Sequence, residues 1–191
     1  VADKTADYQY LAADLLSQAE HDPLACAILI TDDETLANKV ADEVEVQLQK
    51  LPRKEIAAQS LAVQGKIILA KDMDTVVDMA NISAPEHMEI NTREPFALVP
   101  KIRNAGAIFL GAYSPEPLGD YYAGPNHILP TGGTARFYSV LNVETFMKKT
   151  SIISYTREAL AEAADDIIAM AEAEGLQAHA NAIRIRKEKQ L

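Results

Sequence analysis

The four histidines of the chain each stand near an acidic or amide side chain, and such groups can bind a metal ion or move a proton. They are His21, His87, His127 and His179. Nitrogen and oxygen donors suit zinc, and a catalytic zinc keeps one position open for its substrate. Imidazole and carboxylate are also common acid–base groups in enzymes. Spacing along the chain does not by itself bring these residues together in space.

Two of these motifs lie at the ends of expected helices. Gln18 and His21 are three residues apart, so they share one helix face and could bind one ion. The alternative is a solvated helix end, where a histidine complements the helix dipole. Glu174 and His179 flank the junction between two tail helices. From the residues alone, solvent exposure is the simpler interpretation of both motifs.

The sequence Ser83 to His87 (SAPEH) indicates a helix start, with Ser83 as the cap and Pro85 in the first turn. The positive end of the helix dipole would disfavour an imidazolium there. A neutral His87 could then accept a proton, and Glu86 is a second candidate base. The alternative is that Glu86 only complements the dipole beside an incidental histidine.

The stretch 112–137 is rich in Gly, Pro, Tyr and Asn and contains Asp120 and His127. Loops of this length are usually functional or disordered, and the aromatic and apolar residues argue against disorder. Open α/β sheets bind ligands beyond the carboxyl ends of their strands, and this stretch follows an expected strand. It is the strongest of the four motifs for function.

Alternating strands and helices must position these motifs. Short, continuous apolar runs predict buried parallel strands, and helical spacing with caps predicts helices between them. The expected strands are 25–31, 66–70 and 105–111, and the expected helices are 8–20, 34–51 and one from a cap at Asp72 to about residue 79. This alternation indicates an α/β fold, a mostly parallel sheet flanked by helices.

A helical tail follows the expected sheet. An acidic, alanine-rich helix is expected from about Arg157 to Glu174, with Gly175 as its C-cap and a second helix with a basic end after it. We therefore expect residues 1–150 to form an α/β domain with the zinc and catalytic residues, and residues 151–191 to form a C-terminal helical arm.

Composition narrows the classes of partner. The formal net charge is −10, which argues against nucleic acid or an anionic membrane because both select for basic surfaces. No apolar run approaches a membrane span, and the N-terminus lacks a signal-peptide pattern, so we expect a cytoplasmic protein. The single cysteine, Cys26, lies in an apolar run, and we expect a buried, inert thiol.

Four segments together resemble the histidinol dehydrogenase family, in the family's order and separations, over essentially the whole chain. They are DLLSQAEHDP, SAPEHMEI, GDYYAGPNHILPTGG and AEGLQAHANAI. The resemblance implies one zinc per site, a general base at His87 and a water-activating carboxylate at Glu86. The implied zinc ligands are Gln18, His21, Asp120 and His179. These four, with His87, His127 and Glu174, are the implied substrate contacts.

The resemblance also implies a reaction and a partner. L-histidinol would be oxidised through L-histidinaldehyde to L-histidine, the last steps of histidine biosynthesis, with NAD reduced at each step. By the same analogy the enzyme is a homodimer with shared active sites, in which the tail reaches the partner subunit.

The family's enzymes are longer than this chain, and their NAD-binding residues lie in the N-terminal portion. No G-x-G-x-x-G follows a strand here, so we expect an incomplete Rossmann-like domain without cofactor-binding residues, which lacks strands and cannot alone transfer hydride. Two alternatives are an inactive metal-binding fragment and a relative that oxidises another small alcohol.

Overall fold

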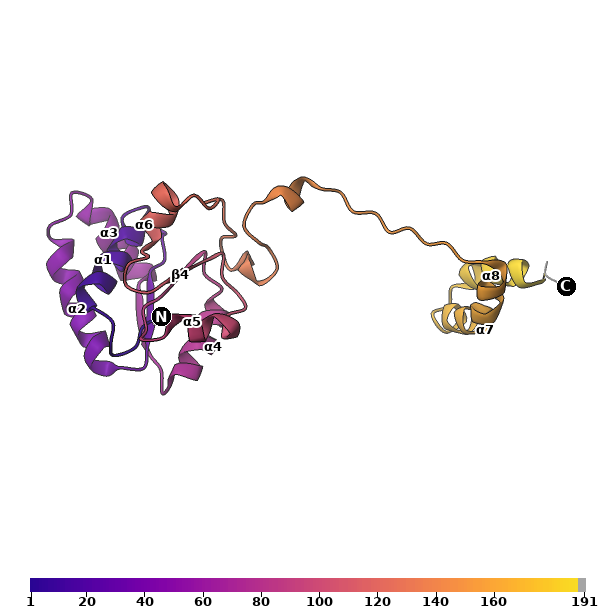
Figure 1. The fold of residues 1–191 in the computed structure, drawn as a ribbon, viewed down its shortest axis with the longest axis horizontal. Helices are drawn as coiled ribbons and strands as arrows, with labels where there is room; N and C mark the ends of the chain where they lie inside the picture. Colours follow the sequence, from indigo (N-terminus) through magenta and orange to yellow (C-terminus); the bar gives the residue numbers. More distant parts are fainter. Residues whose placement is uncertain (189–191) are drawn as a thin grey trace. The chain divides into compact units, whose positions relative to one another are not determined.

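The structure of the chain is a computed structural model that describes residues 1–188. The chain divides into two compact units, Val1–Phe146 and a second unit that starts at Met147 (Figure 1). Whether the domains end at residue 150, as expected, stays a prediction. Within the part of the chain that is described, no helix has the length and apolar character needed to cross a membrane.

The first unit contains four long helices, three of which begin at an aspartate that caps the first turn. The four helices are α1 (Tyr8–Ala19), α2 (Glu34–Leu48), α3 (Lys54–Gln64) and α4 (Met73–Ser83). The carboxylate of Asp33 accepts from the backbone N–H of Leu36 at 2.7 Å, and that of Asp72 accepts from Thr75 N–H at 2.8 Å. Each carboxylate satisfies an N–H that the first turn leaves without a partner. Helix α3 was not expected from the sequence.

Two parallel strand pairs form the sheet. Strand β1 (Ile28–Thr31) pairs with β2 (Lys66–Leu69), and β3 (His87–Ile90) pairs with β4 (Ala107–Leu110). The N-terminal residues lie between the pairs, since Ala2 forms parallel bridges with Thr31, the last residue of β1, and with Asn91, which follows β3. The order is therefore β2, β1, residues 1–3, β3, β4. The expected mostly parallel sheet flanked by helices is confirmed.

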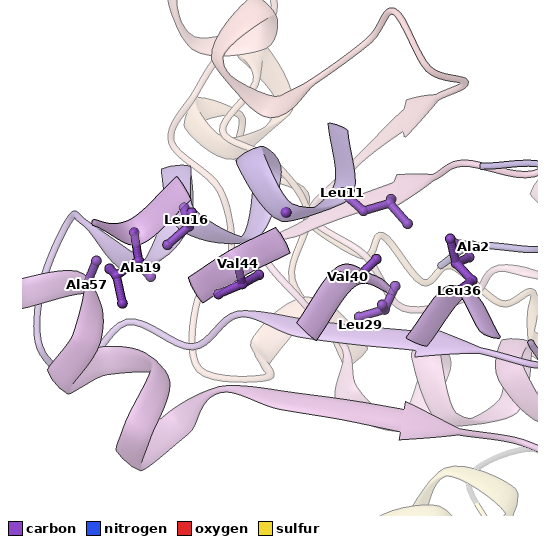
Figure 2. Close-up of a cluster of buried hydrophobic side chains, with 11 residues drawn as sticks. Ala2, Leu11, Leu16, Ala19, Leu29, Leu36, Val40, Val44 and Ala57 are labelled. Carbon is purple, nitrogen blue, oxygen red and sulfur yellow. The ribbon is translucent and has the colours of Figure 1, made fainter. Parts of the chain in front are cut away.

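The core lies on both faces of this sheet. One cluster gathers α1, α2 and β1, and Figure 2 shows Leu11, Leu29 and Val40 within it. The other cluster joins β1 and β3 to α4, with Ile30 and Ile90 in it. Successive strand residues point to opposite faces, so Leu29 and Ile30 enter different clusters. Burial on both faces explains why the strand sequence is continuously apolar.

The helix start expected at Ser83 is wrong. Helix α4 ends at Ser83, whose hydroxyl donates to Ala80 O at 2.8 Å, and Ala84 takes a left-handed conformation with φ 46°. A left-handed residue followed by Pro85 is typical of a helix end. His87 consequently opens β3 rather than a helix, so the dipole argument for its protonation state does not apply.

The thiol of Cys26 is also not buried, contrary to expectation. The residue is exposed, and its Sγ lies 3.5 Å from Gln64 O. It precedes β1 by two residues, so it lies beyond the part of the apolar run that both core clusters cover.

Short helical segments complete the first unit, and a helical hairpin forms the second. The short segments are α5 (Pro95–Leu98), η1 (Val99–Lys101), α6 (Glu116–Leu118), η2 (Gly119–Ala123), η3 (Thr134–Arg136) and η4 (Val143–Phe146). The hairpin consists of α7 (Arg157–Ala173) and α8 (Gln177–Glu188). The C-cap of α7 is Glu174, and Gly175 follows it at φ 74°, a left-handed conformation common for glycine just after a helix.

Candidate active site

The end of α1 brings two of the expected residues to one cavity. Helix α1 stops at Ala19, and the backbone N–H of His21 donates to Gln18 O at 3.3 Å. This turn keeps the two side chains at the same end of the helix. Both line a cavity of about 420 Å³.

The start of β3 places two further expected residues, Glu86 and His87, at the same cavity. The backbone of Glu86 is held against β4, because Ala107 N–H donates to its carbonyl at 2.9 Å. Gly106 permits this approach, since a Cβ on it would lie 2.5 Å from Glu86 O. Glu86 and His87 are half-buried and line the same cavity.

A π-helical turn, η2, carries Asp120 to the cavity. Its first residue, Gly119, packs on the ring of Phe109 so closely that a Cβ there would lie 2.6 Å from Phe109 Cε1. The same ring also contacts the imidazole of His87, with ring centroids 5.9 Å apart. π-Helical turns recur at functional sites. Here the turn, the ring and the imidazole form one packed unit.

Six of the eight expected site residues therefore surround one cavity, although they come from three separate stretches of the chain. They are Gln18, His21, Glu86, His87, Asp120 and His127. Their roles as ligands, base or substrate contacts stay predictions. His127 is exposed and belongs to the long Gly- and Pro-rich stretch.

The remaining two expected residues lie in the second unit. Glu174 is the C-cap of α7, and His179 lies in the first turn of α8. Both are exposed, and both flank the turn at Gly175. Their roles also stay predictions.

A cluster of carboxyl groups that was not predicted from the sequence lies close to His87. Glu116 is buried, and its Oε1 lies 4.0 Å from His87 Nε2. Burial, with the neighbouring Asp120, raises the pKa of Glu116 to about 7. The backbone N–H of Glu116 donates to Glu89 Oε1 at 2.8 Å. Burial, with a hydrogen bond to Asp14, raises the pKa of Glu89 to about 8.

The donor atoms present suit a metal ion. One donor atom each from His87, Glu116 and Asp120 lie within 4.8 Å of one another. Among the described residues, His87 Nε2 is buried without a hydrogen-bond partner, and a buried imidazole nitrogen normally has one. A nitrogen and oxygen donor set of this kind fits zinc. This group shares only Asp120 with the expected zinc ligands, while Gln18 and His21 line the same cavity.

The spacing of three acidic residues from expected site residues could have revealed the missed carboxyl groups. Glu116 precedes Asp120 by four residues, and Asp14 precedes Gln18 by four, which is the spacing of neighbours on a helix. Glu89 follows His87 by two residues in β3, so both face the same side of the strand. Each carboxyl thus stands beside a residue that was already singled out.

Comparison with known proteins gives one consistent result. A family model described as histidinol dehydrogenase matches residues 1–187. Histidinol dehydrogenases of Heliobacterium mobile and Bacillus licheniformis are 59% identical over 189 residues and 57% identical over 190 residues. A crystal structure of histidinol dehydrogenase from Elizabethkingia anophelis is similar with a TM-score of 0.79 and 40% identity.

These matches cover nearly all of this chain but less than half of each relative. The H. mobile match covers 99% of this chain and 44% of that protein, and the B. licheniformis match covers 100% and 45%. The match to the solved structure covers 99% and 43%. The chain corresponds to the C-terminal part of these relatives.

Proposed function

This chain belongs to the histidinol dehydrogenase family, and we propose on that basis that it supplies the metal-binding and proton-transfer part of such an enzyme. The reaction would oxidise L-histidinol through L-histidinaldehyde to L-histidine, with NAD as the hydride acceptor in both steps. The observation that carries the proposal is the gathering of six predicted site residues, from three stretches of sequence, around one cavity.

His87 is the proposed general base. Its imidazole lines the cavity, and Nε2 has no hydrogen-bond partner among the described residues. A neutral imidazole with a free nitrogen can accept the proton of an alcohol held within hydrogen-bond reach. Glu116, at 4.0 Å from Nε2, would stabilise the imidazolium once it forms. The tilted contact with Phe109 restricts the ring.

Glu86 is the proposed base for the second oxidation, in which water must add to the aldehyde. Its carboxylate lies beside His87 at the same cavity. A carboxylate there can take a proton from a water molecule that attacks the aldehyde carbon. Adjacent residues of the chain would thus serve the alcohol step and the aldehyde step in turn.

Gln18, His21 and Asp120 would hold zinc at this cavity, with His179 as the fourth proposed ligand. A bound zinc would supply positive charge that holds and orients the substrate. His127 and Glu174 are the proposed substrate contacts. Glu174 and His179 belong to the second unit, and we propose that they act in the partner's site of a homodimer.

The NAD site is proposed to lie in the part of the longer relatives that this chain does not cover, since the chain has no dinucleotide fingerprint. A cytoplasmic location stays a prediction. An inactive metal-binding fragment and a relative acting on another small alcohol remain the competing functions.

The test measures NADH formation from L-histidinol, NAD and zinc, with this chain alone and with the N-terminal part of a relative added. We expect NADH only with both parts. His87→Asn should then lower turnover by about 10²- to 10⁴-fold while zinc stays bound, and Glu86→Gln should slow histidinaldehyde oxidation most. Glu94→Gln, an exposed change that does not line the cavity, is the matched control.

The competing functions give different results in the same assay. Zinc binding without turnover, even with both parts folded, would support the metal-binding fragment. NADH from another alcohol but not from histidinol would support the relative. Unchanged activity of His87→Asn would remove His87 from the mechanism.

A further inference from the structure

Strands β1 and β3 face each other across a slot that residues 1–3 fill only at one end. A cavity of about 540 Å³ continues this slot from Val1. Its lining includes Ile28 and Ile30 of β1 and His87 and Glu89 of β3. Paired strands normally lie about 5 Å apart, so a sheet interrupted here leaves room for one more strand.

The hydrogen bonds of residues 1–3 define how a strand in this slot would align with β1 and β3. Ala2 N–H donates to Ile30 O at 3.1 Å, and Asn91 N–H donates to Val1 O at 2.8 Å. The amino group of Val1 donates to Glu89 O at 2.9 Å. Residues 1–3 therefore bond alternately to β1 and to β3, as a central strand of a parallel sheet does.

The same register extends upstream of Val1. Alternate residues of a strand turn their N–H and C=O groups to the same side. The backbone groups of Ile28 therefore face the slot as those of Ile30 do, and those of His87 face it as those of Glu89 do. Two carbonyls, of Ile28 and His87, are then aimed at the N–H groups of the two residues before Val1. Four amides, of Ile28, Ile30, His87 and Glu89, are aimed at the carbonyls of the four residues before it.

Helices cover the slot on both of its faces. Leu11 and Leu15 of α1 line it on one side, and Ala80 and Ser83 of α4 line it on the other. A buried strand needs this double cover.

We propose that this slot binds an extended strand of four residues, parallel to β1 and β3 and continuous with Val1. The occupant is the segment that immediately precedes these residues in a longer form of the chain. The relatives provide such a segment, since this chain covers less than half of each of them and corresponds to their C-terminal part. The slot shares Gln18, Glu86 and His87 with the candidate active site, so the strand would also border that site.

The test adds residues to the chain and measures amide hydrogen exchange by NMR, which needs no enzyme activity. One protein carries Val-Thr-Val-Thr before Val1, which places valines toward α4. Its control carries Val-Thr-Pro-Pro, which lacks the two N–H donors aimed at Ile28 O and His87 O. The amide of Leu29, which faces β2, is the internal control.

We expect the first extension to slow exchange at Ile28, Ile30, His87 and Glu89 by at least about tenfold, relative to the unextended chain. The Pro-Pro extension should leave those four amides unchanged. Unchanged exchange with the first extension would overturn the proposal, as would equal slowing by both extensions. Protection of these amides in the unextended chain that rises with protein concentration, with a dimer in light scattering, would identify a second copy as the occupant and overturn it too.

Discussion

The substitution Gly119→Ala should disturb the packing that carries Asp120 to the cavity. The new Cβ would lie 2.6 Å from Phe109 Cε1 and 3.0 Å from Cζ, whereas carbon atoms in contact lie about 3.5–4.0 Å apart. The ring or the π-helical turn must therefore move by about 1 Å. The same ring contacts His87, with centroids 5.9 Å apart.

Inserting a methyl group into a packed site typically costs about 1–3 kcal/mol, and we expect Gly119→Ala to lower the free energy of unfolding by that amount. Urea unfolding followed by circular dichroism measures it, with an unchanged m-value as the sign that the unfolded state is unaffected. A shift of the His87 ring resonances in NMR spectra should accompany the loss.

The ring itself provides the decisive comparison. In the double variant Gly119→Ala with Phe109→Leu, the smaller side chain leaves space for the methyl group, so the two changes should couple by about 1 kcal/mol or more. Gly124→Ala is the matched control, because Gly124 has φ 88° but nothing within 4 Å of a new Cβ. Phe109→Leu should not rescue that control. Additive effects of Gly119→Ala and Phe109→Leu, within about 0.5 kcal/mol, would refute the steric argument.

Two further predictions concern buried polar groups. Asn81→Ala should lower the free energy of unfolding, measured by urea titration, by about 3 kcal/mol. The Asn81 side chain makes three hydrogen bonds to the backbone of residues 101–104, and each contributes about 1 kcal/mol. A loss below about 1 kcal/mol would contradict this prediction. Burial raises the pKa of Glu89 from 4.5 to about 8 in the folded chain, so the folded state favours the protonated carboxyl. The stability that this protonated form contributes is lost as pH rises from about 4.5 to 8. Glu89→Gln should therefore flatten the fall of stability over that window, while exposed Glu94→Gln should not, and equal slopes for all three proteins would refute the assignment.

Local chemistry was enough to predict several elements. The run that contains Leu29 and Ile30 could only be buried on both faces, and it forms β1. Asp33 and Asp72 cap α2 and α4 because a carboxylate satisfies the free N–H groups of a first turn wherever one follows. Gly175 ends α7 for a comparably local reason, the ease with which glycine takes positive φ.

Other elements depended on contacts that no local pattern contains. The segment Ser83 to His87 has the residues of a helix start, yet Ser83 ends α4 and His87 opens β3. Pairing with β4 and with residues 1–3 decides this, because backbone hydrogen bonds to both hold residues 85–91 extended. A strand with two charged or titratable residues in four, as in β3, lacks the apolar signal that revealed β1.

The sequence by itself determined the family, the alternation of helices and strands, and the residue types available for chemistry. Tertiary structure alone decided which of them meet. Gln18, His87 and Asp120 share a cavity because the end of α1 and the starts of β3 and η2 meet there. The proton affinity of Glu116 likewise depends on burial beside Asp120. Both follow from distances and desolvation in the folded chain, which residue spacing does not encode.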